Sequence, residues 1–114
     1  MSISPNKVKE LQFNAERGDI VSQYYLGLHY SGGNTDVANQ AEAAKWYRKA
    51  ADQGDADAQF NLGGQYARGH GVAKDVAEAA RWYRKAADQG DSEAAIKLRL
   101  LMRVHAPTPL QKIY

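Results

Sequence analysis

The strongest constraint on the fold of this chain is an internal repeat with a period of 36 residues. Residues 45–55 read KWYRKAADQGD and residues 81–91 read RWYRKAADQGD, so the two segments differ only at their first position. The same shift aligns Leu26-Gly27 with Leu62-Gly63. A fixed period of this length is typical of a repeat architecture, in which each unit buries its apolar face against its neighbours. We therefore predict one domain, spanning residues 1–114, built from similar stacked units.

Each period is predicted to hold two helices. In the segment 39–53, Ala43, Trp46, Tyr47 and Ala50 are spaced at i, i+3, i+4 and i+7, which places them on one stripe of a helix. At this spacing the aromatic residues are expected to lie in the core rather than to stack on a ligand.

The helix ends are predicted from capping residues. We expect N-caps at Asn39 and Asp75, because each has a Glu three residues further on, as in a capping box. Gly54 suits the left-handed position just after a helix, and Asp55 can cap the helix that follows. The same Gly-Asp pair recurs at 90–91, so each pair is expected to end one helix and start the next.

The second helix of each period carries a glycine in its interior, at Gly27 and Gly63. A glycine there costs about 1 kcal/mol relative to alanine. The position therefore predicts that a neighbouring helix approaches closely, with Tyr66 filling the space one turn after Gly63.

Composition and motifs argue against an enzyme. The chain has no cysteine, which excludes disulfides, thiolate metal sites and cysteine nucleophiles. It has no Gly-rich phosphate loop, HExxH or GxSxG motif. The histidines, His29, His70 and His105, have no second ligand at metal spacing. We predict no catalytic, cofactor-binding or metal-binding residues and no cofactor.

The charge and the amino-terminal residues bear on location. The formal net charge is only +2, from 15 basic and 13 acidic residues. The first residues are not followed by an apolar run, so they do not form a signal peptide, and no stretch approaches the ~18 apolar residues of a membrane span. The expected location is the cytoplasm, and a mature periplasmic or secreted form is compatible with the same residues.

One feature favours nucleic acid as an alternative partner. Basic residues recur on the first helix of each period, and stacked repeats would align them into a stripe that could follow phosphates. Acidic residues at helix-neighbour spacing offset this stripe, so protein binding is favoured. The stripe consists of Lys45, Arg48, Lys49, Arg81, Arg84 and Lys85.

The repeat resembles the Sel1-like repeat family, a relative of the tetratricopeptide repeats. The matching motifs are AQFNLGGQYARGHGV at 58–72 and DVAEAARWYRKAADQG at 75–90, and the resemblance covers roughly residues 15–98. The loop at 31–37 has lost the Gly-x-Gly-Val pattern of the second repeat. Residues 5–17 resemble a degenerate first helix, with Leu11 at the tyrosine position.

This resemblance implies an all-α fold, a right-handed α/α solenoid of antiparallel helix pairs with about six helices. The expected segments are a degenerate helix at 5–18, repeats at 19–54 and 55–90, a partial repeat or capping helix at 91–105 and a tail at 106–114.

The resemblance also implies a non-catalytic adaptor that binds a protein partner. Family members in bacteria often act in host interaction, envelope processes or toxin neutralisation, so an immunity or regulatory partner protein is a narrower hypothesis. Leu28 and Gly64 replace the Asn of a carboxylate clamp, which argues against that binding mode. By analogy, the concave face is formed by Val21, Tyr25, Leu28, Asp57, Asn61, Gly64, Ala67 and Arg68.

The carboxyl-terminal end departs from the repeat. Its last helix carries apolar residues around most of its circumference, whereas the last helix of a solenoid should present a polar outer face. Prolines in 106–114 stop the helix. We expect this end to pack against the tail or against a second copy, forming a homodimer, through Leu100, Leu101, Met102, Leu110, Ile113 and Tyr114.

Overall fold

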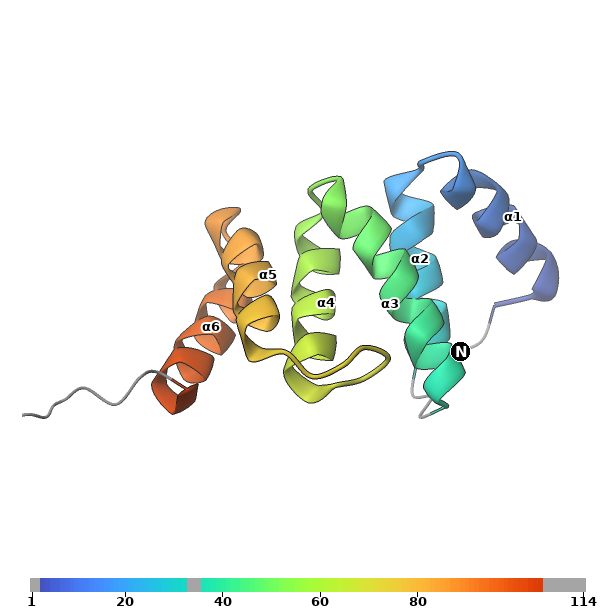
Figure 1. Cartoon of the computed structure of the whole chain (residues 1–114). Coiled ribbons are helices and arrows are strands. Elements are labelled where there is room, and N and C mark those ends of the chain that lie inside the picture. Colours follow the sequence, from blue (N-terminus) through green and yellow to red (C-terminus); the bar gives the residue numbers. More distant parts are fainter. Residues whose placement is uncertain (1–2, 33–35, 106–114) are drawn as a thin grey trace, which may run out of the picture.

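The predicted helical solenoid is confirmed. The computed structural model describes residues 3–32 and 36–105, and these form six helices and no strand. The helices follow one another along an elongated body with extents of 63 × 29 × 22 Å (Figure 1). They are α1 (Pro5–Glu16), α2 (Ile20–Ser31), α3 (Val37–Asp52), α4 (Ala56–Arg68), α5 (Val76–Asp88) and α6 (Ser92–His105).

The helical hairpins turn at the predicted Gly-Asp pairs. Gly54 and Gly90 have φ of +101° and +103°, a left-handed conformation that costs little without a Cβ. Asp55 accepts a hydrogen bond from the backbone N–H of Ala58 at 2.8 Å, and Asp91 accepts one from Ala94 at 3.0 Å. These carboxylates satisfy amide donors at the start of α4 and α6, so each pair ends one helix and starts the next.

One predicted cap is wrong. Helix α3 begins at Val37, because Asp36 Oδ1 accepts from the backbone N–H of Ala38 at 2.8 Å and of Asn39 at 3.4 Å. Asn39 therefore lies inside the helix rather than at its N-cap. The cap predicted at Asp75 is confirmed, since it accepts from the Glu78 amide at 3.0 Å.

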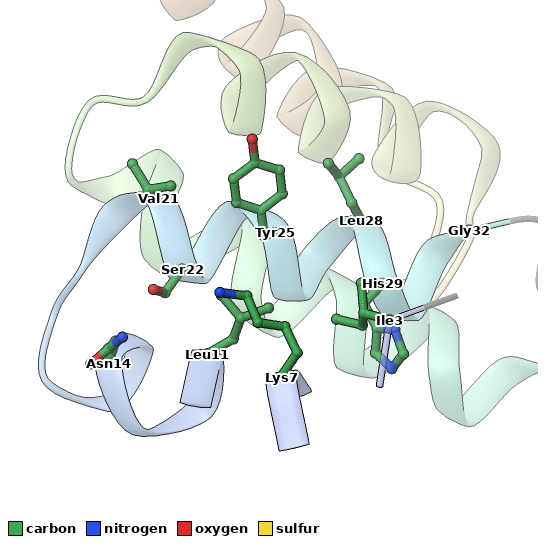
Figure 2. A pocket seen from close by; sticks show the side chains of 10 residues that line it. All are labelled: Ile3, Lys7, Leu11, Asn14, Val21, Ser22, Tyr25, Leu28, His29 and Gly32. Carbon is green, nitrogen blue, oxygen red and sulfur yellow. The ribbon is translucent and has the colours of Figure 1, made fainter. Parts of the chain in front are cut away.

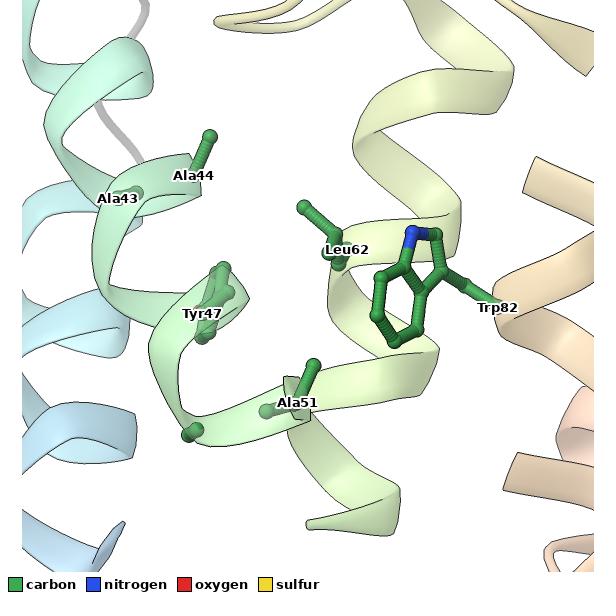
Figure 3. Packing of buried hydrophobic residues seen from close by; sticks show 8 residues of the cluster. Ala43, Ala44, Tyr47, Ala51, Leu62 and Trp82 are labelled. Carbon is green, nitrogen blue, oxygen red and sulfur yellow. The ribbon is translucent and has the colours of Figure 1, made fainter. Parts of the chain in front are cut away.

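Trp46 and Trp82 lie in the core, as predicted, with 2% and 3% of their surfaces exposed. In Figure 3, the Trp82 indole reaches from α5 to Leu62 of α4, which faces Tyr47 and Ala51 of α3. This cluster joins three successive helices. Trp46 belongs to a separate cluster with Leu11, Ala15 and Leu26.

The glycines inside α2 and α4 mark close helix–helix approaches, as predicted. A Cβ added to Gly63 would lie 2.9 Å from Cδ1 of Tyr83, and one added to Gly27 would overlap the Tyr47 ring. The atoms nearest to Gly63 belong to Tyr83 of α5 and not to Tyr66, which was expected to fill this space. The tyrosine of each Trp-Tyr pair therefore packs on the glycine of the preceding helix.

A ladder of glutamine side chains links successive units. Gln89 Nε2 donates to Gly54 O at 2.8 Å and to Gln59 Oε1 at 2.9 Å, and Gln59 Nε2 donates to Ala51 O at 3.2 Å. One period earlier, Gln53 donates to Gly18 O and to Gln23 at 3.0 and 2.9 Å. The amide groups thereby donate to carbonyls at the helical turns, where the helix supplies few N–H donors of its own.

Among the described residues, no helix has the length and apolar character that crossing a bilayer would require.

Candidate functional site

The predicted concave-face residues on α2 are apolar and open to solvent. Val21, Tyr25 and Leu28 are 60%, 51% and 37% exposed. Each lies 36 positions before a predicted residue of α4, where Asp57 is exposed, Asn61 is partly buried and Gly64 is buried. The two repeats thus differ at these positions. The side chains on α2 are apolar, whereas those on α4 are polar or, at Gly64, missing.

A large hollow lies between α1 and α2. It has a volume of about 830 Å³ and includes all three apolar residues of α2 (Figure 2). Figure 2 shows the Lys7 and Leu11 side chains reaching from α1 toward α2, which carries Tyr25 and Leu28. The hollow is lined by Ile3, Lys7, Leu11, Asn14, Val21, Ser22, Tyr25, Leu28, His29 and Gly32.

The α1 residues of this hollow were missed by sequence reasoning. The signal was present, because Lys7, Leu11 and Asn14 occupy the positions of Ala43, Tyr47 and Ala50 one period later. Three departures from the core pattern on one helix face indicate that this face does not pack as its counterparts do. From the sequence alone, Leu11 at the tyrosine position predicts only a degenerate first helix.

A smaller hollow of about 290 Å³ lies between α2 and α4 and brings Leu28, Asn61 and Arg68 together. Its wall includes the Tyr47 hydroxyl, which lies 2.9 Å from Ser31 Oγ. Burial raises the pKa of Tyr47, so the phenol stays protonated and available for hydrogen bonding. Gln65 also lines this hollow, and its Oε1 has no hydrogen-bond partner in the described residues.

A third hollow of about 300 Å³ joins α4 to the last helix. It brings the predicted residues Ala67 and Arg68 next to Leu100 and Leu101, with Tyr83 at its base. Arg68 therefore borders two hollows. Asp57 and Gly64 line none of the three.

The basic stripe is partly engaged in contacts within the chain. Arg48 donates to the Tyr66 hydroxyl and lies 3.9 Å from Glu78, which also pairs with Arg81 at 2.7 Å. The Lys85 ammonium lies 4.8 Å from the centroid of the Trp82 ring system, at cation–π distance. These contacts pair part of the stripe with acidic or aromatic groups instead of leaving it as a row of free cations.

No metal-binding cluster of three or more His, Cys, Asp or Glu residues occurs in residues 3–32 and 36–105. His29 lines the large hollow and contacts Tyr30 edge-on at 4.9 Å, and His70 lines the 290 Å³ hollow. Asp55 and Asp91 act as helix caps.

The carboxyl-terminal helix leaves apolar side chains exposed. Leu100 and Met102 are 47% and 49% exposed, and Val104 is more exposed. Leu101 is partly buried against a cluster formed by Ala79, Tyr83, Ala86 and Ala94 of α5 and α6. Leu110, Ile113 and Tyr114, the other residues predicted for self-association or tail packing, lie outside the described residues.

Comparisons with known proteins agree with the repeat. The Sel1 repeat family model matches residues 20–55 and 56–91. A crystal structure of a Sel1 repeat protein from Oxalobacter formigenes is similar, with 40% identity and a TM-score of 0.75. The match covers 82% of this chain and 38% of that protein, so this chain spans well under half of its relative.

A second similar structure is a protective antigen of uropathogenic Escherichia coli strains with an SLR fold. It shares 30% identity over 76% of this chain and 26% of its own, with a TM-score of 0.48. No curated protein sequence matches the chain significantly.

Proposed function

Because the chain belongs to the Sel1 repeat family, we propose that it is a non-catalytic adaptor that binds another protein on its solenoid surface. Sel1 repeat proteins generally mediate protein–protein interactions. A bacterial immunity or regulatory partner protein, acting in the cytoplasm, is the narrower form of this proposal.

The observation that carries the proposal is the division between core and surface on α2. The same helix buries Leu26 and Gly27 in the repeat interface and exposes Val21, Tyr25 and Leu28 around a large hollow. Grouped exposed apolar side chains of this kind are typical of binding surfaces, because burying them against a partner releases water. The 290 Å³ hollow extends this surface toward Arg68.

Site-specific photo-crosslinking in cells of the source organism tests the proposal. A photoreactive phenylalanine would replace Tyr25, Arg68 or, as a matched surface control, Val37, which is 78% exposed at the start of α3. We expect a discrete protein to be crosslinked from position 25 or 68 and not from 37. Identical products at all three positions would contradict a specific surface. Products removed by nuclease would favour the nucleic-acid alternative instead.

A further inference from the structure

The repeats show what fills the groove between a pair of helices. Helix α2 packs against both α3 and α4, with Gly27 against the Tyr47 ring and Ser31 beside its hydroxyl. Helix α4 packs against α5 in the same way, with Gly63 against the ring of Tyr83. In each case an even-numbered helix lies across the face of the next odd-numbered one.

The same face of α1 carries no such helix in the described residues. The positions equivalent to Ala43, Tyr47 and Ala50 are Lys7, Leu11 and Asn14, and all three line the 830 Å³ hollow. The other wall is α2, where the exposed Tyr25 occupies the repeat position of Asn61, through which α4 borders the α2–α4 hollow (Figure 2). The groove is therefore the repeat-equivalent of two grooves that the molecule fills with its own helices.

We propose that the α1–α2 groove binds one amphipathic helix of a partner protein, in the place that α2 and α4 take in the following grooves. This inference rests on the proposed function and names its site and the kind of partner. A second copy of this chain fits poorly, since α6 aligns Arg99 with Gly63 and Arg103 with Ala67, which would bring guanidinium groups toward Leu11 and Lys7.

The shape of the groove differs from its counterparts in a way that selects the partner. Tyr47 and Tyr83 each press on a neighbouring helix so closely that the neighbour carries glycine. At the equivalent position of α1 stands Leu11, which is smaller than tyrosine; it belongs to the buried cluster with Leu26 and Trp46 and also lines the hollow. The partner helix therefore carries a large apolar side chain, such as leucine, where α2 and α4 have Gly27 and Gly63.

The charge of the groove adds a second requirement. Its lining contains Lys7 and His29 and no carboxylate. The positions equivalent to Lys7 in the other repeats are alanines. The Lys7 ammonium lies 3.1 Å from Glu10, but both side chains are more than half exposed, and such a pair exchanges partners at little cost. In the second repeat, Ala67 lies one turn after Gly63 and packs in the same cluster as Ala79, which is the equivalent of Lys7. A residue one turn after the large apolar one would therefore lie near Lys7. The partner helix is thus expected to carry an acidic residue one turn after its large apolar one.

A peptide taken from α4 of the same chain can serve as the probe. A labelled peptide with the sequence of residues 55–69 keeps the Asp55 cap, and a second version carries Gly63→Leu and Ala67→Glu. We expect the substituted peptide to bind at least about tenfold more tightly than the parent, since burying a leucine side chain is worth more than a decade of affinity. Fluorescence anisotropy would give the affinities, and amide shift changes in NMR spectra would locate the peptide at α1 and α2.

Two variants of the protein test the two requirements separately. Leu11→Tyr restores the tyrosine of the other repeats, and it should abolish the preference for leucine over glycine in the peptide. Lys7→Glu should weaken binding of the acidic peptide, and a peptide with Gly63→Leu and Ala67→Lys should recover the lost affinity. Val37→Ala, at an exposed position that lines none of the hollows, is the control and should leave binding unchanged. Circular dichroism confirms that each variant is folded.

The inference would be overturned by shifts confined to α4–α6, by equal affinity of the two peptides, or by unchanged selectivity in Leu11→Tyr. These outcomes are separate from failure of the adaptor function. A cellular partner that is crosslinked at position 68 but not at position 25 would support the adaptor function and contradict binding in the α1–α2 groove. If the peptides bind as expected but no cellular partner is crosslinked, the result would support helix binding in the groove and contradict the adaptor function.

Discussion

At the residue scale, the contact between a tyrosine ring and a helical glycine sets the distance between neighbouring helices. Gly63 has the Tyr83 ring against it, whereas the next residue, Gly64, faces the end of the flexible Arg68 side chain. Both glycines are buried in the same helix. They therefore separate the effect of close packing from the general cost of glycine in a helix.

We expect Gly63→Ala to destabilise the fold by about 1–3 kcal/mol, because the new methyl group would force the buried ring to move. Gly64→Ala is the matched control, since the Arg68 guanidinium, 3.1 Å from where the new Cβ would lie, can swing away. The control should be neutral or gain up to about 1 kcal/mol of helix propensity. Urea unfolding measures both variants, and equal stability of the two would contradict the close approach.

The tyrosines that form this contact also link stability to pH. Burial raises the pKa of Tyr83 above its ordinary value of 10.0, and the positive charge of Arg68 opposes this rise only in part. The folded state thus keeps the phenol proton at pH values where the unfolded chain has lost it. The unfolded state binds fewer protons there, so stability falls as pH rises above about 10.

Tyr83→Phe removes this proton and should therefore lose less stability than the parent between about pH 8 and pH 11. Urea midpoints at the two pH values measure the loss. Tyr25→Phe, which removes an exposed phenol from α2, controls for general alkaline effects. An identical loss in Tyr83→Phe and the parent would show that the buried phenol is not responsible.

At the scale of the helices, the glutamine ladder connects each unit to the next at the turns. Gln89 sits at the C-cap of α5 and reaches Gly54 O and Gln59 Oε1, and Gln59 in turn reaches the end of α3. The ladder stops at α6, where Ala95 takes the position of Gln59.

Gln89→Ala should cost about 0.5–1.5 kcal/mol, because it removes an exposed and a part-buried hydrogen bond at the turn. Asp88→Ala, which alters the exposed neighbouring side chain, should change stability by less than about 0.5 kcal/mol. Adding Gln59→Ala to Gln89→Ala completes a double-mutant cycle, and the two effects should not add, because the side chains bond to each other. Additive effects would show that the ladder does not act as a unit.

The helices were predictable because their patterns are local and occur twice. The Trp-Tyr stripe and the Gly-Asp turns recur at a shift of 36, so one copy supports the other. The start of α3 was missed because capping depends on which side chain folds back onto the amides. Asn39 aligns with Asp75, yet Asp36 supplies the acceptor three residues earlier.

The proposed binding surface was predictable only in part. Val21, Tyr25 and Leu28 were identified by analogy and do border the large hollow. The opposite wall depends on how α1 is covered by the other described helices, and no local sequence pattern reports that arrangement. Leu11 has the same apolar character whether it packs in a core or lines a groove, so its role required the arrangement of α1 against α2.

At the scale of the whole molecule, the array packs mainly between successive helices, so its two ends differ from its middle (Figure 1). The first end is the α1–α2 groove. The other end is α6, which exposes Leu100, Met102 and Val104. Burying the exposed apolar side chains of α6 against another surface would be favourable.

We expect residues 106–114, either of the same chain or of a second copy, to provide that surface. Deleting them should halve the mass measured by light scattering if the segment bridges two copies. If the segment covers its own helix, the mass should stay constant and binding of an apolar fluorescent dye should rise. Leu100→Lys with Met102→Lys in the shortened chain should remove the extra dye signal, because it removes the exposed apolar patch, and circular dichroism checks that α6 persists. Unchanged mass together with unchanged dye binding would show that residues 106–114 cover nothing, and the apolar face of α6 would then be open to a partner.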